Sequence, residues 1–190
     1  MSARRLYWRS FAAVAVLLPV ALWTASGDSY FEYRKKQAVV ETVADVGAAQ
    51  EYGGSEWRID RYDTWKGQLP AMQGARTIST QPTALPDGVS LVRVRVALRP
   101  KSGEAVKALL MCQLELVDAQ GRRWTSQTVQ TSVRREVPTS CNGSYNNEPQ
   151  VAQEYRFEQD FLVPDDAANG VDAVIRLRAE QPRRLRLRLR

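Results

Sequence analysis

Apolar and polar residues alternate with a period of two in several short segments of the second half of the chain. In residues 90–98 the alternate positions from 92 onward are Val92, Val94, Val96 and Leu98, while Arg93 and Arg95 lie between them. The same alternation recurs in four further segments, 108–117, 154–163, 173–178 and 184–190. A period of two predicts strands with one buried face, and short strands separated by turn residues are typical of an antiparallel β-sandwich. We therefore expect an all-β domain without a sustained helix.

The pattern between residues 28 and 90 is less regular. A weak apolar pattern of valines before residue 50 predicts one short strand at the end of a linker. Trp57 and Ile59 alternate with polar neighbours and predict another strand. Residues 66–88 are rich in Pro, Gly, Gln and Thr and predict a long loop, and Asp118–Gly121 predicts a turn.

The N-terminal segment has a different pattern. Phe11–Trp23 is an uninterrupted apolar run that follows three arginines. The stretch from Leu6 to Ala25 reaches about 30 Å as a helix, which matches the hydrocarbon thickness of a bilayer. A buried core helix would be polar on one face, and this run is not. We expect residues 1–27 to be a single transmembrane signal-anchor, with a cleaved signal peptide as the alternative.

This segment implies a domain organisation. Residues 1–27 form the anchor, residues 28–50 a stalk and residues 51–190 the β-sandwich. Basic residues are equally frequent on both sides of the apolar run, so their count does not set the orientation. Because translocating an arginine-bearing N-terminus is unfavourable, we expect a single-pass protein of the cell membrane with an extracytoplasmic C-terminal domain.

The composition of the chain excludes several kinds of catalytic and binding site. The chain contains no histidine, which removes imidazole bases and most zinc or haem ligation. The net charge of +6 is concentrated at the two ends of the chain. A nucleic-acid-binding domain normally carries a basic face in its body, so we expect no nucleic-acid partner. We also expect no cofactor and no bound metal.

The two cysteines belong to different environments. Cys112 lies on the apolar side of a predicted strand, and Cys141 lies in the polar stretch 138–144. They are either isolated thiols or one disulfide bond, and an oxidising exterior favours the bond. Asn142-Gly-Ser144 is formally a glycosylation acceptor, but Asn-Gly is also a common turn.

Three groups of residues are candidates for chemistry or binding. The carboxylates Asp60 and Asp63, and likewise Asp165 and Asp166, are spaced for acid–base work or calcium binding, although turns and helix caps use the same residues. The aromatic group of Trp57, Tyr62 and Trp65 is either a stacking platform or part of the core.

The third group is the arginine-rich C-terminus. As a strand it would place leucines at positions 185, 187 and 189 inward and project four arginines outward, Arg184, Arg186, Arg188 and Arg190. Such a row either makes contact with an anionic surface or is a solvated strand face that discourages edge-to-edge pairing.

A family resemblance rests on the order of these motifs. The apolar N-terminal segment is followed by Gly54-Ser-x-Trp-x-Ile59, by Val92–Val96, by a Cys-x-Leu-x-Leu-x-Asp-x-x-Gly-x-x-Trp stretch from Cys112 to Trp124, by Cys141, and by Phe157–Pro164. This order resembles uncharacterised membrane-anchored immunoglobulin-like domains of actinobacteria, which are similar in outline to secreted mycobacterial immunoglobulin-like antigens. Over about residues 50–190 the resemblance implies an immunoglobulin-like sandwich and a Cys112–Cys141 bridge, and no established activity.

These observations lead to one expected function and its rivals. We expect a non-enzymatic binding or structural module of the cell envelope whose partner is a protein or an anionic polymer. A hydrolase of envelope material that works through carboxylates alone is one alternative. A sandwich protein secreted after signal-peptide cleavage is the other.

Overall fold

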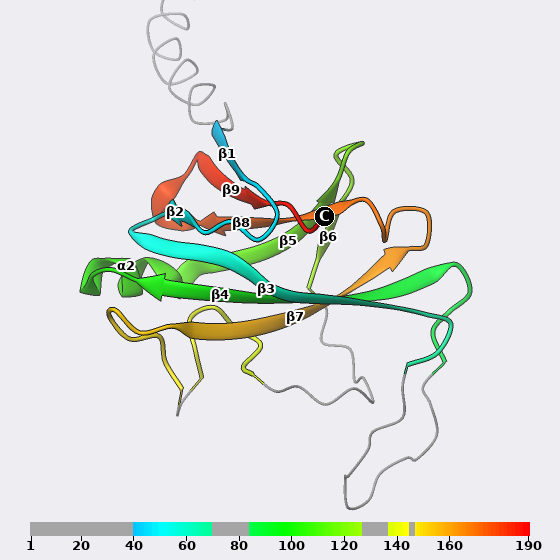
Figure 1. Ribbon diagram of the computed structural model, residues 1–190, viewed down its shortest axis with the longest axis horizontal. Helices are drawn as coiled ribbons and strands as arrows, with labels where there is room; N and C mark the ends of the chain where they lie inside the picture. The colour runs from blue at the N-terminus through cyan, green and yellow to red at the C-terminus, as the bar shows by residue number, and fades with distance from the viewer. Residues whose placement is uncertain (1–39, 70–83, 127–136, 145–146) are drawn as a thin grey trace, which may run out of the picture. The chain divides into compact units, whose positions relative to one another are not determined.

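The computed structural model describes residues 40–69, 84–126, 137–144 and 147–190 (Figure 1). The expected anchor at 1–27 and most of the expected stalk lie outside these ranges. Residues Val40–Arg190 form one compact unit. No helix within the described ranges is long and apolar enough to span a membrane.

The described residues form two β-sheets (Figure 1). The five-stranded sheet has the order β1 (Val40–Ala44), β9 (Arg183–Leu187), β8 (Val171–Leu177), β5 (Cys112–Asp118) and β6 (Arg123–Thr125). The four-stranded sheet has the order β2 (Gln50–Tyr52), β3 (Ser55–Lys66), β4 (Val89–Pro100) and β7 (Tyr155–Pro164). Neighbouring strands are antiparallel except β1 and β9, which are parallel.

A single core joins the two sheets and confirms the predicted sandwich. The four-stranded sheet contributes the alternating residues of β4 and β7, and the five-stranded sheet contributes those of β5, β8 and β9. Among the core side chains are Val94, Phe157, Leu116, Ile175 and Leu185, each with 0% of its surface exposed. Each such burial contributes about 1.5–3 kcal/mol, so the alternating residues supply the main force that holds the two sheets together.

The sandwich begins earlier than residue 51. Strand β1 pairs with β9 in the register Val40↔Arg183 to Ala44↔Leu187, and β2 begins at Gln50. The predicted short strand is therefore present, but it belongs to the sheet and is not part of a stalk. The weak pattern has a physical reason, because Ala44 is buried whereas Val40 and Val43 are 54% and 45% exposed.

The prediction of one continuous strand over residues 108–117 is wrong. Gly103–Ala108 form the short helix α2, and Leu109–Met111 form the 3-10 helix η1. The Ser102 side chain caps α2 by accepting a hydrogen bond from the Ala105 amide at 3.2 Å. Strand β5 consequently starts at Cys112, and Leu110, which we expected on the buried face, is 66% exposed.

Strand β3 is longer than predicted and contains a β-bulge. Its pairing with β4 shifts between Ile59 and Arg61, which leaves Asp60 as an extra residue. Trp57 and Ile59 face the core before the bulge, and Tyr62 does so after it. The extra residue therefore moves Arg61, Asp63 and Trp65 to the outer face of the sheet.

The base of the predicted loop 66–88 is part of the folded unit. Gln68 and Ala84 form an isolated β-bridge, and residues 70–83 lie outside the described ranges. Next to the bridge a second, small apolar cluster forms on the outer face of the four-stranded sheet, made by Leu69, Leu85 and Leu91 with Trp65 and Leu162 packed against them.

Candidate functional site

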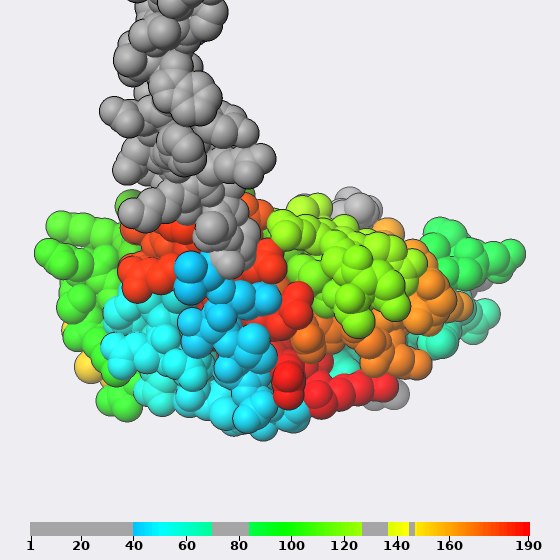
Figure 2. All heavy atoms as spheres, turned by 90° about the horizontal axis from the view of Figure 1, so that it is seen from above, coloured from blue at the N-terminus to red at the C-terminus, as the bar shows by residue number. Residues whose placement is uncertain are grey.

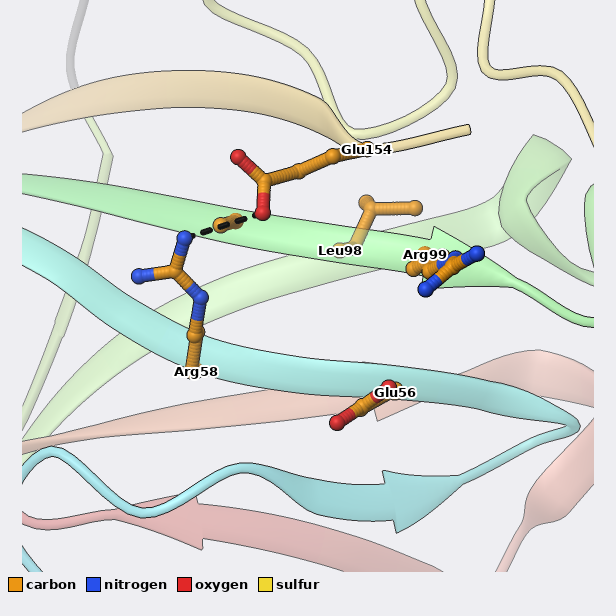
Figure 3. A pocket seen from close by; sticks show the side chains of 6 residues that line it. Glu56, Arg58, Leu98, Arg99 and Glu154 are labelled. Atoms are coloured by element: carbon orange, nitrogen blue, oxygen red, sulfur yellow. Dashed lines mark hydrogen bonds and ion pairs between the residues drawn. The ribbon is translucent and has the colours of Figure 1, made fainter. Parts of the chain in front are cut away.

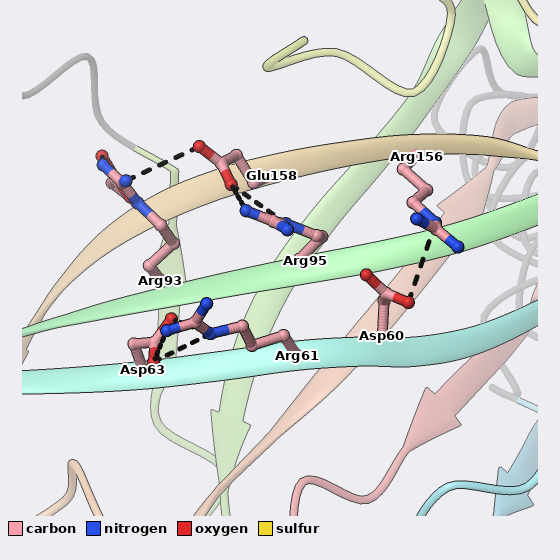
Figure 4. A network of polar contacts seen from close by, with 8 residues as sticks. Asp60, Arg61, Asp63, Arg93, Arg95, Arg156 and Glu158 are labelled. Atoms are coloured by element: carbon pink, nitrogen blue, oxygen red, sulfur yellow. Dashed lines mark hydrogen bonds and ion pairs between the residues drawn. The ribbon is translucent and has the colours of Figure 1, made fainter. Parts of the chain in front are cut away.

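The outer face of the four-stranded sheet carries a set of paired charges that we call the charged face (Figure 4). It is formed by outward-facing residues of β3, β4 and β7: Arg58, Asp60, Arg61, Asp63, Arg93, Arg95, Arg156, Glu158 and Asp160. The strand register explains their proximity, because Arg93 lies opposite Asp160 and Arg95 lies opposite Glu158 in the β4–β7 ladder. Directly opposed side chains of opposite charge attract each other.

The centre of the charged face is buried. Arg93 donates to Asp160 through two nitrogens, at 2.7 Å from Nε and 2.9 Å from Nη2. Arg95 donates to one oxygen of Glu158 at 3.2 and 2.9 Å, and Arg93 approaches the other oxygen at 3.5 Å. The side chains of Glu158 and Asp160 have no exposed surface, and that of Arg93 is 5% exposed. Buried charges at this position are tolerated only because they are paired.

Burial and ion pairing shift the pKa of Arg93 in opposite directions. Burial lowers the pKa of its guanidinium, but the hydrogen bonds and charge of Asp160, with further attraction from Glu158, hold the pKa above its ordinary value. Arg93 therefore stays a cation. It also stacks on the Trp65 ring, with 5.6 Å between the guanidinium carbon and the ring centroid.

A second group of ion pairs extends the charged face toward the start of β7. Glu154 accepts from Arg58 at 2.9 Å and from Arg156 at 2.5 Å. Asp60, the bulge residue, lies 3.4 Å from Arg58 and 3.7 Å from Arg156. The hydrogen bond from Arg58, followed in strength by that from Arg156, holds the pKa of Glu154 below its ordinary value despite some loss of hydration.

A small polar pocket lies at this end of the charged face (Figure 3). Its volume is about 170 Å³, and it is lined by Glu56, Arg58, Ala97, Leu98, Arg99 and Glu154. The outward row of β4 reads Arg93, Arg95, Ala97, Arg99, and Ala97 is its one small side chain. Ala97 lies opposite Arg58 on one side and Arg156 on the other. The short alanine side chain therefore leaves the hollow between longer neighbours.

The turn that precedes Glu154 is held by the pocket residue Arg99. Ala152 has a φ of 62°, a conformation that residues other than glycine seldom adopt. Its carbonyl accepts from Nε of Arg99 at 3.0 Å, and its amide donates to the Pro100 carbonyl at 2.7 Å. These two contacts fix the turn and thereby place Glu154 above Arg58.

The disulfide bond predicted from the sequence is present and connects the two sheets indirectly. Cys112 and Cys141 are joined by an S–S bond of 2.08 Å. Cys112 begins β5 of the five-stranded sheet. The residues before Cys141 instead follow β7, since the Glu158 amide donates to the Pro138 carbonyl at 2.8 Å and the Tyr155 hydroxyl donates to the Ser140 carbonyl at 2.8 Å. The bond thus fastens this segment, which borders the charged face.

The Asn142-Gly143-Ser144 sequence forms a turn. Gly143 has a φ of 94°, and a Cβ atom at this position would approach the Asn147 carbonyl oxygen to 2.7 Å. Glycine is therefore required here. The structure confirms the turn.

The four candidate carboxylates each have a separate partner. Asp63 is paired with Arg61 at 2.9 Å, and Asp60 with Arg58 and Arg156. At the end of β7, Asp165 accepts from the Ser90 hydroxyl and Asp166 accepts from Arg122 at 3.1 Å. In the part of the chain that the structure describes, no three acidic or cysteine side chains are grouped so that they could hold a metal ion.

The aromatic group is divided between the two faces of the sheet. Trp57 is completely buried in the core and donates from its indole nitrogen to the Tyr52 carbonyl at 2.9 Å. Tyr62 packs against the same core, whereas Trp65 belongs to the apolar cluster on the outer face. The three rings therefore do not form one stacking surface, and the core alternative holds for Trp57 and Tyr62. The bulge at Asp60 only determines that Trp65, and not Tyr62, is the ring on the outer face.

The C-terminal strand has the predicted alternation of leucine and arginine, but its arginines are paired with neighbouring side chains. Leu185, Leu187 and Leu189 are buried. On the other face, Glu41 lies 3.0 Å from Arg184 and 3.2 Å from Arg186. Strand β9 is an inner strand between β1 and β8, so its arginines do not guard an edge. Figure 2 shows the N-terminal strand and the C-terminal residues packed side by side.

The last two arginines of the row also have partners. Arg188 is paired with Asp45 at 3.3 Å. Arg190 donates to the Tyr62 hydroxyl at 2.6 Å and to Asn169 at 3.1 Å. The carboxylates beside β9 consequently neutralise much of the positive charge that the sequence suggested.

The buried members of the charged face were missed at the sequence level. Glu158 and Asp160 alternate with core residues, and a period of two indicates the face opposite the core but not whether that face is buried. Their signal was the spacing: Arg-x-Arg in β4 and Glu-x-Asp in β7 have equal spacing and opposite sign. This spacing predicts ion pairs only if β4 and β7 are adjacent strands, and the sequence does not show which strands are adjacent.

The two sheets and the disulfide make the chain a β-sandwich with one internal disulfide bond. Comparisons with known proteins found similar folds and no further relationship. No protein-family model and no curated protein matches the chain. It is similar to an uncharacterized β-sandwich protein of Clostridium difficile 630, with a TM-score of 0.43 and 10% identity over 80% of this chain and 96% of that one. It is also similar to the yjhA protein of Bacillus subtilis, with a TM-score of 0.47 and 8% identity over 76% of this chain and 99% of that one.

A conserved hypothetical protein of Bacillus anthracis is a third similar structure, with a TM-score of 0.44 and 11% identity over 72% of this chain and 93% of that one. The assignment of the β-sandwich rests on the chain's own sheets and shared core. These similarities assign no activity or ligand to the chain.

Proposed function

We propose that the chain is a non-enzymatic module of the cell envelope, anchored in the membrane by residues 1–27 and folded outside it. The observation that carries this proposal is the Cys112–Cys141 disulfide in a small β-sandwich. Such bonds persist in oxidising compartments and are rare in the cytosol. The apolar N-terminal run supports retention in the membrane, and its cleavage would make the same domain a secreted protein.

The proposal includes an immunoglobulin-like class for the sandwich and a kinship with the actinobacterial domains that the sequence resembles. The strand order supports the class. In the five-stranded sheet β8 lies between β5 and β9, as strand F lies between C and G in immunoglobulin domains. The other sheet contains β3, β4 and β7, which correspond in order to A, B and E. The disulfide departs from the usual B–F position, because it starts on β5.

The role proposed is binding or spacing of a partner, either a protein or an anionic polymer of the envelope. The pairing of Asp60, Asp63, Asp165 and Asp166 with separate cations or a hydroxyl favours this role over a hydrolase. A glycosidase needs two carboxylates facing one bond. Four carboxylates already neutralised in separate contacts do not offer that arrangement.

The C-terminal arginines are the proposed contact for an anionic surface. Their pairing with Glu41 and Asp45 lowers the attraction expected from four free charges, which would be about 1 kcal/mol for each arginine near the surface. Replacing Arg184, Arg186, Arg188 and Arg190 with Gln should therefore weaken binding to phosphatidylglycerol vesicles only modestly in low salt. Unchanged binding would remove this surface from the proposal.

The location is tested by fractionation of intact cells. We expect the chain to remain in membranes washed at alkaline pH and to be digested by protease added outside the cells. A matched chain with Val16 and Leu17 replaced by Arg, which interrupts the apolar run, should be lost from the membranes. Full protection from external protease would contradict the proposed orientation, and a shortened chain in the medium would support the secreted alternative.

A further inference from the structure

We propose that the pocket at the end of the charged face binds a small zwitterion, of the kind formed by the ammonium and carboxylate groups of a free amino acid. This inference is independent of where the domain is located. It rests on two charged side chains of opposite sign that line the pocket and are not paired with each other. They are Glu56 on β3 and Arg99 on β4.

Glu56 and Arg99 are directly opposite in the β3–β4 ladder. Cross-strand neighbours of opposite charge would ordinarily form an ion pair, since their Cβ atoms are about 4.5–5.5 Å apart. Here no ion pair joins Glu56 to any residue within the described ranges. Arg99 uses its Nε atom to hold the Ala152 carbonyl, which aims the side chain along the rim of the pocket. The terminal nitrogens of Arg99 are thus available for a carboxylate.

The other two charged residues that line the pocket, Arg58 and Glu154, are paired with each other. Arg58 and Glu154 form a hydrogen bond of 2.9 Å, and Arg156 neutralises Glu154 further. Glu51, which lies opposite Glu56 on β2, is bound to Lys101 at 2.6 Å. A ligand ammonium therefore finds one unpaired carboxylate among the residues that line the pocket, Glu56.

The size and floor of the pocket limit the ligand to a small molecule. The cavity volume of about 170 Å³ exceeds what a single water needs. The floor is formed by Ala97, and any longer side chain there would occupy the space. An anion alone would satisfy Arg99 but leave Glu56 unpaired, and a cation alone would do the reverse. A zwitterion satisfies both groups at once.

The test is a calorimetric titration of the full-length chain with glycine, L-alanine and D-alanine. Acetate and methylammonium serve as probes that carry one charge each. We expect saturable binding of the zwitterions, with a dissociation constant on the order of 1 mM, as is reasonable for so few ligand atoms in a half-open pocket. Acetate and methylammonium should bind at least about tenfold more weakly, because each meets only one of the two charges.

Three variants and two matched controls locate the site. Glu56→Gln and Arg99→Gln should each weaken binding at least about tenfold, and Ala97→Leu should abolish it by filling the floor without changing any charge. The controls Glu51→Gln and Arg61→Gln remove nearby charges that do not line the pocket and should bind as the parent chain does. Urea unfolding of each variant establishes that it is folded before titration.

Each alternative outcome overturns the inference. If no zwitterion binds saturably to the folded chain, the pocket is an ordinary gap between surface charges. If acetate binds as well as glycine, the site is a simple anion site at Arg99. If binding survives both Glu56→Gln and Arg99→Gln in folded protein, the ligand is bound elsewhere.

Discussion

At the residue scale, the unusual feature is a set of charges buried on the face of the sheet that is opposite the core. Placing Arg93, Glu158 and Asp160 out of water costs hydration energy, which their mutual contacts offset only while every member is present. The sequence located these residues on the outer face correctly. It did not reveal their burial, since burial depends on which strands are neighbours and on what covers them.

Removing one member should therefore be strongly destabilising. We expect Asp160→Ala to lower the free energy of unfolding by about 3–5 kcal/mol, because Glu158 alone would then face both Arg93 and Arg95 and one buried positive charge would lack a counter-charge. The measurement is urea denaturation of the purified chain. The matched control is Asp63→Ala, which breaks a pair whose arginine side chain is 58% exposed and should cost about 0–1 kcal/mol. Equal effects of the two changes would contradict the burial described for Arg93.

The stability of the fold should also depend on pH through a single residue, Glu154. The hydrogen bond from Arg58 is the main reason that the pKa of Glu154 in the folded chain lies below its ordinary value. A carboxyl with a lowered folded pKa stabilises the fold above the unfolded pKa and loses that contribution as the pH falls through the folded pKa. We expect the urea midpoint to fall on acidification below about pH 4.5.

A Glu154→Gln variant is the control for this pH effect. It should show a smaller loss of stability over the same pH interval, because the amide does not titrate. The contribution is modest, since the Glu154 side chain is 41% exposed. A parent and variant with identical midpoints at every pH would show that this pairing does not contribute to stability.

At the scale of elements, alternation predicted most strands but could not detect a change of register. The faces of β4, β7 and β9 were predicted correctly because most of their apolar residues follow a period of two, although Gln159 interrupts it in β7. In β3 the period is interrupted at Asp60, so that Tyr62 returns to the core and Trp65 leaves it. The short helix α2 was missed for a different reason, because six residues are too few to display a helical period.

The bulge can be tested by deletion. Removing Asp60 makes Ile59 and Arg61 consecutive residues, and these two already pair with Val96 and Arg95, so the later residues of β3 should keep their faces. We expect this variant to unfold cooperatively in urea, with a loss of about 0–1 kcal/mol, because the arginines that lose a partner are 36% and 46% exposed. Removing Arg58 instead turns Ile59 outward and Asp60 toward the core, and this variant should lose its cooperative transition. Equal loss of cooperativity in the two deletion variants would contradict the register described here.

At the scale of the whole molecule, the sandwich is closed by contacts between distant parts of the chain. Strand β1 pairs with the last strand, β9, and the disulfide fastens the segment beside β7 to the other sheet. The bond closes a loop with a sequence separation of 29 residues. In the chain-entropy model such a closure is worth about 3–4 kcal/mol, a large part of the stability of a small domain.

The most direct test of the account is the redox state of the two cysteines in the living cell. Cells are treated with a membrane-permeant alkylating reagent that adds mass to free thiols, and the chain is then analysed without reductant and, in parallel, after reduction. We predict that neither Cys112 nor Cys141 is modified before reduction and that both are modified after it. Two alkylated cysteines in the unreduced sample would contradict both the bridge and the extracytoplasmic location proposed from it.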